Sequence, residues 1–207
     1  MKYLKHTFFL FAILTGIIAC KKEIKLANTK EIKPTTTKVV EKTSNADLGL
    51  KYAMTTKAQL GKNLLGTIKN KGTEEALIFC NVRAFTLTDS MAVVQKVAIK
   101  RVSDKPRNAN NKANMKEMVQ IEKFKKDFAS GKKIEPVIES LENDSIQFYY
   151  PIITNKMCLQ CHGVPNKDIK PTVIKKITDL YPTDKAIGYS ENQVRGIWNV
   201  KMKNQEN

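Results

Sequence analysis

The sequence predicts an α+β domain with an antiparallel sheet over residues 46–207, and three patterns predict it. Apolar residues recur at helical spacing over residues 46–70, and this helix is expected to end near Gly72. Residues 92–102 alternate between apolar and polar side chains, as a strand does. Residues 134–153 favour two strands that turn at Asn143-Asp144.

The remaining elements follow from shorter signals. Thr73 is the expected N-cap of a second helix, which carries Cys80 and has two glutamates in its first turn. The polar residues 104–114 are expected to form a loop. Residues 115–131 predict an amphipathic helix that stops at a glycine. After a proline-containing loop and a short helix, residues 193–202 are predicted to form the last strand.

The first 45 residues differ in composition from the rest. Residues 1–19 combine two lysines, an apolar run too short to span a bilayer comfortably, and small residues before Cys20. They predict a signal peptide, and the exit IIAC resembles the lipobox of bacterial lipoproteins, whose cysteine is acylated. An ordinary signal peptide with an incidental cysteine is the alternative. Residues 20–45 predict a flexible tether, so the domain is expected to be exported, lipid-anchored and on a periplasm-facing membrane surface.

The chain is strongly basic, with a formal net charge of +16. Its lysines are spread along the sequence, and an exported lipoprotein seldom meets nucleic acid, so nucleic acid is not expected as a partner. Anionic lipid headgroups or an acidic protein fit better than nucleic acid, and a solvated, unspecific basic surface fits best.

The stretch CLQCHG at residues 158–163 carries the clearest chemistry. C-x-x-C-H is compatible with a zinc site, a redox-active dithiol or covalent haem attachment. Zinc takes about four ligands, and Cys80 is the one further free Cys or His in the predicted mature chain. A dithiol normally follows the first strand of a βαβ unit, whereas this motif comes late. Haem c fits best: Cys158 and Cys161 would bond to its two vinyl groups, and His162 would ligate the iron.

The second axial position of such an iron cannot be a histidine of the same chain. His6 lies in the predicted signal peptide, which leaves His162 alone. Cysteine, methionine, lysine, water or no ligand stay open. Small cytochromes c carry the attachment motif near their start, whereas here most of the domain precedes it. Met202 lies in the predicted last strand, where a packing role is expected.

Four segments stand out together: EEALIFCNV around Cys80, VAIKRVSDKPRNANNKAN at 97–114, FYYPIITNKMCLQCHG at 148–163 and YPTDKAIGYSENQVRGIWNV at 181–200. They resemble the family of c-type haem domains with a PAS-like fold. The resemblance implies an α+β PAS-like domain with one covalently bound haem, whose axial ligands are His162 and Cys80. A small buried hydrophobe is the alternative for Cys80.

The same motifs place charged residues at Arg107 and Arg195. A guanidinium offers a fork that suits haem propionates, and a surface position is the alternative for each. Four further residues are expected to wall the haem, although an ordinary core role would give the same sequence: Tyr149, Tyr150, Pro151 and Trp198.

These expectations describe a membrane-tethered monohaem protein that senses redox state or a diatomic gas such as NO or CO. Its output would pass to a separate redox or signalling protein. A thiolate ligand favours ferric iron, so a low reduction potential is expected. The alternative is a periplasmic electron-transfer cytochrome. An enzyme is not expected, because no acid–base pair or nucleophile constellation accompanies the motif.

Overall fold

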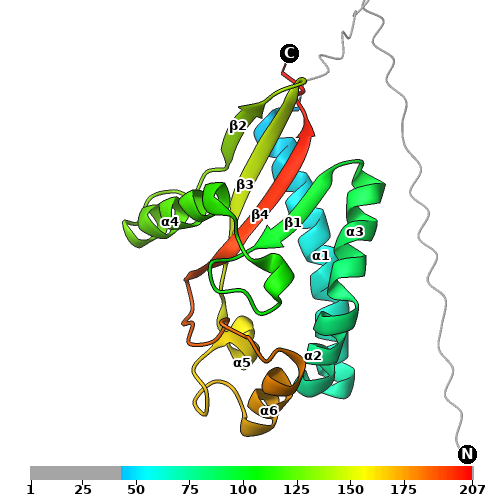
Figure 1. Ribbon diagram of the computed structural model, residues 1–207, viewed down its shortest axis with the longest axis vertical. Coiled ribbons are helices and arrows are strands. Elements are labelled where there is room, and N and C mark those ends of the chain that lie inside the picture. The colour runs from blue at the N-terminus through cyan, green and yellow to red at the C-terminus, as the bar shows by residue number, and fades with distance from the viewer. Residues whose placement is uncertain (1–42, 207) are drawn as a thin grey trace, which may run out of the picture. The chain divides into compact units, whose positions relative to one another are not determined.

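The computed structural model describes residues 43–206 (Figure 1). The expected signal peptide, Cys20 and nearly all of the expected tether lie outside these residues. The described elements are α1 (Asn45–Lys71), α2 (Thr73–Val82), α3 (Ala84–Gln95), β1 (Ala98–Val102), η1 (Ala109–Asn111), α4 (Met115–Ala129), β2 (Val137–Leu141), β3 (Ser145–Ile153), η2 (Lys156–Cys158), α5 (Leu159–His162), α6 (Pro171–Leu180) and β4 (Val194–Lys203).

The four strands form one antiparallel sheet in the order β1-β4-β3-β2. The last strand therefore lies inside the sheet, between the first strand and the hairpin. Asn143 and Asp144 have φ angles of 56° and 52°, the left-handed conformation that tight hairpin turns require and that Asn and Asp tolerate. The predicted α+β class, the hairpin and the last strand are confirmed.

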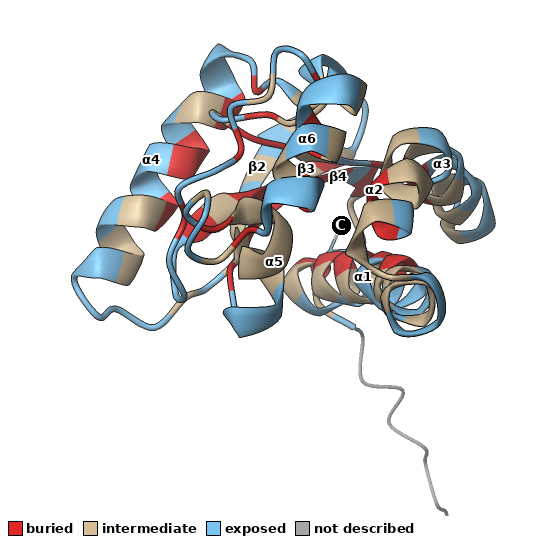
Figure 2. Ribbon diagram, turned by 90° about the horizontal axis from the view of Figure 1, so that it is seen from below, coloured by how far each residue is buried: buried red, intermediate tan, exposed pale blue. Residues whose placement is uncertain are grey.

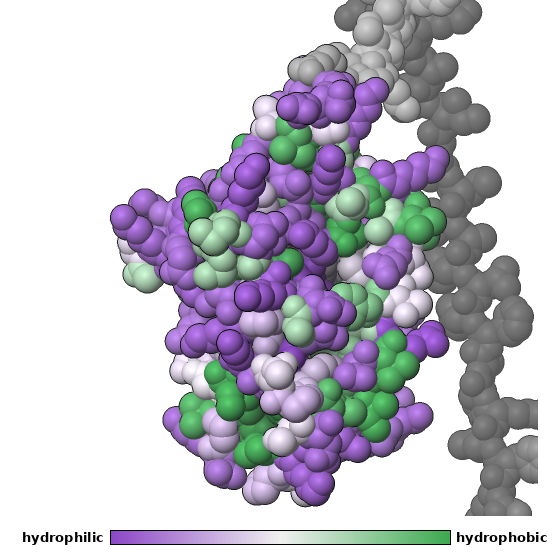
Figure 3. All heavy atoms as spheres, in the orientation of Figure 1, coloured by the Kyte–Doolittle hydropathy of each residue, from purple (hydrophilic) through white to green (hydrophobic). Residues whose placement is uncertain are grey.

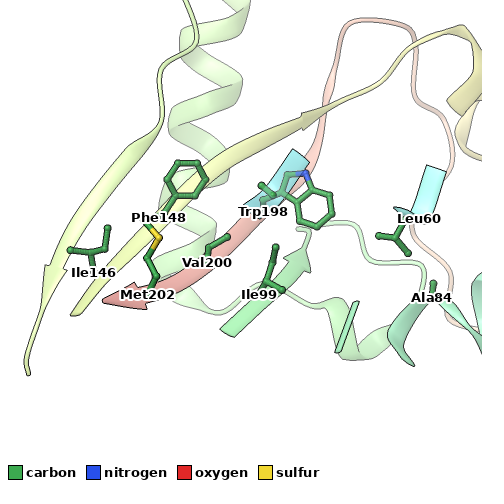
Figure 4. Close-up of a cluster of buried hydrophobic side chains, with 9 residues drawn as sticks. Leu60, Ala84, Ile99, Ile146, Phe148, Trp198, Val200 and Met202 are labelled. Atoms are coloured by element: carbon green, nitrogen blue, oxygen red, sulfur yellow. The ribbon is translucent and has the colours of Figure 1, made fainter. Parts of the chain in front are cut away.

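Helices cover both faces of the sheet. Figure 2 shows α4 on one side of the strands and α1 to α3 on the other. The buried residues of α1 recur every three or four positions, so that one stripe of the helix faces the sheet. This stripe packs against Phe148, Trp198 and Val200, and Met202 also packs in this core, as expected (Figure 4).

A buried carboxylate attaches α4 to the opposite face. Asn114 and Glu117 form a capping box at the start of the helix. The Glu117 carboxylate also accepts a hydrogen bond from Asn199 Nδ2 of β4 at 2.5 Å and pairs with Lys100 Nζ of β1 at 2.7 Å. Ile121 and Phe124 of the same helix are fully buried against the sheet.

Two predicted boundaries were wrong. The expected strand at residues 92–102 begins only at Ala98, because residues 92–95 belong to α3. Val93 and Val94 are exposed, so their apolar character does not reflect a buried strand face. Thr73 is the first residue of α2 and does not cap it; the N-cap is Gly72, whose φ of 90° suits glycine.

The close approach of α1 to the sheet leads to a testable prediction. A Cβ at Gly49 would lie 2.2 Å from Cδ2 of Phe148. Gly49→Ala is therefore expected to lower the free energy of unfolding by about 1–3 kcal/mol, measured by urea denaturation. Gly61→Ala in the same helix is the control, because nothing lies within 4 Å of its added Cβ, and it should stabilise by about 0.5–1 kcal/mol. Equal effects of the two substitutions would contradict the close packing.

Candidate functional site

A cavity of about 290 Å³ lies at the end of the sheet where α1, α2 and the α5 segment meet. In Figure 1 this is the lower end of the domain, away from the start of α1. Apolar residues form most of its wall, and charged and sulfur-bearing side chains lie among them. The residues that line it include Cys80, Arg101, Ser103, Arg107, Ile152, Ile153, Cys158, Cys161, His162, Arg195 and Gly196.

The structure brings the four sulfur and imidazole groups of the sequence prediction to this one cavity. Cys158 ends η2, whereas Cys161 and His162 lie on the single turn of α5. Three-residue spacing in a helical turn places Cys158 and Cys161 on the same side. Cys80 comes from α2, which packs against α6 through Leu77, and Cys161 is in contact with that same cluster.

The C-x-x-C-H motif is held in place by contacts with its neighbours. The Asn155 side chain accepts hydrogen bonds from the backbone of Met157 and Cys158. Gly163 follows the motif because a Cβ there would lie 2.5 Å from Asp168 Cβ and 2.7 Å from the carbonyl oxygen of Leu159. The motif geometry therefore depends on Asn155 and Gly163 as well as on the cysteines.

His162 is oriented by the loop that precedes β4. Its Nδ1 lies 2.7 Å from the carbonyl oxygen of Ala186, and its own carbonyl accepts from the N–H of Tyr189 at 2.9 Å. A carbonyl oxygen can only accept, so Nδ1 carries the proton and Nε2 keeps its lone pair. Burial holds the pKa of His162 well below its ordinary value, and the charges of Arg195 and Arg107 lower it further. The imidazole is thus neutral and ready to act as a ligand.

Burial raises the pKa of two thiols that line the cavity. It raises the pKa of Cys161 to about 11 and also raises that of Cys80. The charge of Arg107 opposes both shifts, and the charge of Arg101 opposes the shift at Cys80. Cys80 and Cys161 are therefore poor nucleophiles at neutral pH.

Arg107 forms a network of hydrogen bonds within the protein, and its predicted contact with a propionate stays a prediction. Its Nε and Nη2 donate to the two carboxylate oxygens of Asp184 at 3.2 and 3.1 Å. Nη2 also lies 2.6 Å from the carbonyl oxygen of Cys161 and 3.3 Å from that of Ala186. Arg107 therefore joins the attachment motif to the carbonyl that orients His162, and Asp184 neutralises its charge.

Arg195 also lines the cavity, as expected, and Arg101 joins it. Arg195 Nη1 donates to Ser103 Oγ at 2.7 Å, and its guanidinium lies over the Tyr189 ring. Arg101 is stacked against Trp198 at 5.9 Å. The Nε atoms of both arginines are buried and have no hydrogen-bond partner in the structure. Arg101 is not among the site residues predicted from the sequence. Its inward position could have been inferred, because it lies two residues after the buried Ile99 and side chains two apart in a strand lie on the same face of the sheet.

The four residues predicted to wall the haem do not line the cavity. Tyr150 and Trp198 pack in the core beside α1, whereas Tyr149 lies on the opposite face with α4. Pro151 lies two residues after Tyr149 in β3, on the same face of the sheet, and pairs with Ile197 of β4. The cavity is lined instead by the ends of the strands, Ile152, Ile153 and Gly196, beside the register shift in β3. The prediction for Tyr149, Tyr150, Pro151 and Trp198 is corrected accordingly.

Between residues 43 and 206, no three His, Cys, Asp or Glu side chains are grouped closely enough to hold a metal ion among themselves. In the same range no single helix has the length and apolar character to cross a membrane, although α2 and α3, bent by 53° at their junction, meet the criterion as a pair.

Fold and site together define an α+β domain that presents a C-x-x-C-H turn and an opposing cysteine to one cavity. The chain belongs to the Tll0287-like family, whose model matches residues 21–203, and the predicted family resemblance is confirmed. The fold is similar to that of the cyanobacterial heme-protein Tll0287, known from a crystal structure. That match has 20% sequence identity and a TM-score of 0.54, and it covers 74% of this chain and 94% of the other. No curated protein matches the chain.

Proposed function

We propose that this chain is a cytochrome-like protein that binds one haem c through thioether bonds from Cys158 and Cys161. The convergence of the C-x-x-C-H turn and Cys80 on one cavity carries the proposal. Family membership supports it, because the solved structure of similar fold is described as a heme-protein. A bound haem would supply an iron that takes axial ligands, exchanges electrons and can bind diatomic gases.

The residues present fit a haem in three respects. The cavity wall is mostly apolar, as the porphyrin ring requires. His162 presents an unprotonated Nε2 with its ring fixed through Nδ1. Two arginines with unpartnered buried Nε atoms supply donors for acidic substituents. His162 is the ligand on the attachment side, and Cys80 on α2 is the candidate for the other side.

We further propose that the protein senses redox state or a diatomic gas, with Cys80 as the exchangeable ligand. His162 is fixed by hydrogen bonds from its ring and its backbone to the loop before β4. Cys80, in contrast, lies on a ten-residue helix with a break at each end. Gly72 precedes α2 with a φ of 90°, and the chain bends by 53° into α3. Release of Cys80 would free α2 to move, and this movement would carry the signal.

The surface around the cavity is suited to a protein partner. Met157, Val164 and Ile187 are apolar and between 38% and 41% exposed. Figure 3 shows apolar surface at this lower end of the domain. Asn45 and Asn204 are hydrogen-bonded at the far end of the domain, at 2.7 Å. The described chain begins at that far end, so the segment that would carry a lipid anchor at Cys20 joins the domain there.

Carbon monoxide binding to the reduced protein tests the sensing role. Cys80→Ala removes the competing ligand, so its ferrous form should bind CO at least about tenfold more tightly than the wild type, as measured by optical titration. The ferric spectrum of the wild type should show thiolate character that this variant lacks. Cys80→Met, which retains a sulfur ligand, is the control. Rapid electron exchange with no CO binding in the wild type would favour the electron-transfer alternative.

A further inference from the structure

The arginines around the cavity leave an excess of positive charge. Arg101, Arg107 and Arg195 all line it. The charge of Arg107 is cancelled by Asp184, with which it forms two hydrogen bonds. In residues 43–206 neither Arg101 nor Arg195 forms an ion pair, although the charges of Asp184 and Asp104 act to raise the pKa of Arg195. The cavity wall therefore holds two guanidinium groups without a direct carboxylate partner.

Such an arrangement is unfavourable unless acidic groups neutralise it. A buried charge without a partner is costly, and each buried Nε leaves a donor unsatisfied. Burial lowers the pKa of Arg101, and repulsion by the charge of Arg195 lowers it further. The polar contacts that they do make are to a hydroxyl and to aromatic rings, which cannot neutralise them.

The two side chains lie at the ends of neighbouring strands. Arg101 lies on β1 opposite Trp198 of β4, and Arg195 lies at the start of β4, where it binds Ser103 just beyond β1. Both side chains line the cavity, and the sheet fixes their backbones. A ligand with two carboxylates close together would satisfy both.

We infer that Arg101 and Arg195 form a binding site for two carboxylates, the two propionates of the haem, and that Arg107 takes no part in it. This inference rests on the proposed function, since it assigns the acidic substituents of the same cofactor. Two carboxylates match two unpaired guanidinium groups in charge, and each can accept from the fork of one arginine. Arg107 is instead a positioning residue of the attachment motif.

The inference is tested by comparing haemin with haemin dimethyl ester, in which both propionates are esterified. The full chain with Cys158→Ser and Cys161→Ser keeps the ligand non-covalent, so affinities are measurable by absorbance titration. Haemin should bind at least about tenfold more tightly than the ester. The preference should disappear when Arg101→Met and Arg195→Met are added, and it should persist in the control Arg83→Met, which alters an exposed arginine outside the cavity.

A second readout separates recognition from structural support. Removal of two unpaired buried cations should leave the Tm of the ligand-free protein unchanged or raised, whereas loss of a structural residue would lower it. An equal affinity for haemin and its ester, or a preference that survives both arginine substitutions, would overturn the inference. Succinate binding as tight as that of haemin would assign the site to a free dicarboxylate instead. Failure of both porphyrins to bind would contradict the proposed function itself.

Discussion

Replacement of both Cys158 and Cys161 by alanine is expected to abolish covalent haem attachment. Both side chains line the cavity from one turn, which Asn155 and Gly163 hold in place. A thioether requires the cysteine sulfur itself, so the double variant should lose essentially all haem on a denaturing gel stained for haem. Each single variant retains one attachment point and should keep part of the signal.

The control for this experiment is Cys80→Ala. Cys80 lines the same cavity but belongs to α2, and no attachment role is proposed for it. Its covalent haem content should equal that of the wild type. A double variant that still carries haem after denaturation, or a Cys80→Ala variant that loses it, would contradict the assignment of the attachment cysteines.

Loss of the Arg107–Asp184 pair is expected to have the largest effect on stability. The two side chains are 9% and 7% exposed, and they share two hydrogen bonds. Asp184→Asn would leave the Arg107 charge buried without a counter-charge, and such a change typically costs about 3–5 kcal/mol. Arg107→Lys keeps the charge but removes the fork, so the contacts with Asp184, Cys161 and Ala186 cannot all be made.

Urea denaturation of the Asp184→Asn and Arg107→Lys proteins measures these losses. The double variant should be less destabilised than the sum of the two single variants, because the residues form one network. Lys175→Ala is the matched control: its pair with Asp179 is exposed and contributes about 0–1 kcal/mol. A loss below about 1 kcal/mol for Asp184→Asn would show that the pair does not hold the motif.

The regular elements were predictable where local periodicity and burial coincide. The buried stripe of α1, the apolar face of α4 and the Asn143-Asp144 turn all leave a direct record in the sequence. The prediction failed at residues 92–95, where the apolar residues Val93 and Val94 are exposed on α3. An alternating pattern cannot tell an exposed valine from a buried one, because burial is decided by tertiary packing.

The site was predictable to the extent that its chemistry is local. Cys158, Cys161 and His162 form a contiguous motif, and Cys80 followed from the resemblance and from a shortage of other ligands. The roles of the arginines were not predictable, because Arg107 meets Asp184 only in the folded chain. The residues predicted to wall the haem do not line the cavity for a related reason. Alternation along the strand places Tyr149 and Tyr150 on opposite faces of the sheet, but it does not show which end of the sheet adjoins the cavity.

The central claim is that this chain carries one haem on Cys158 and Cys161. Mass spectrometry of the denatured protein, produced in a host with haem-attachment machinery, tests it most directly. The measured mass should exceed that of the processed polypeptide by one haem, and the peptide containing residues 158–162 should carry the addition. A protein that reaches the exported compartment with both cysteines unmodified would contradict it.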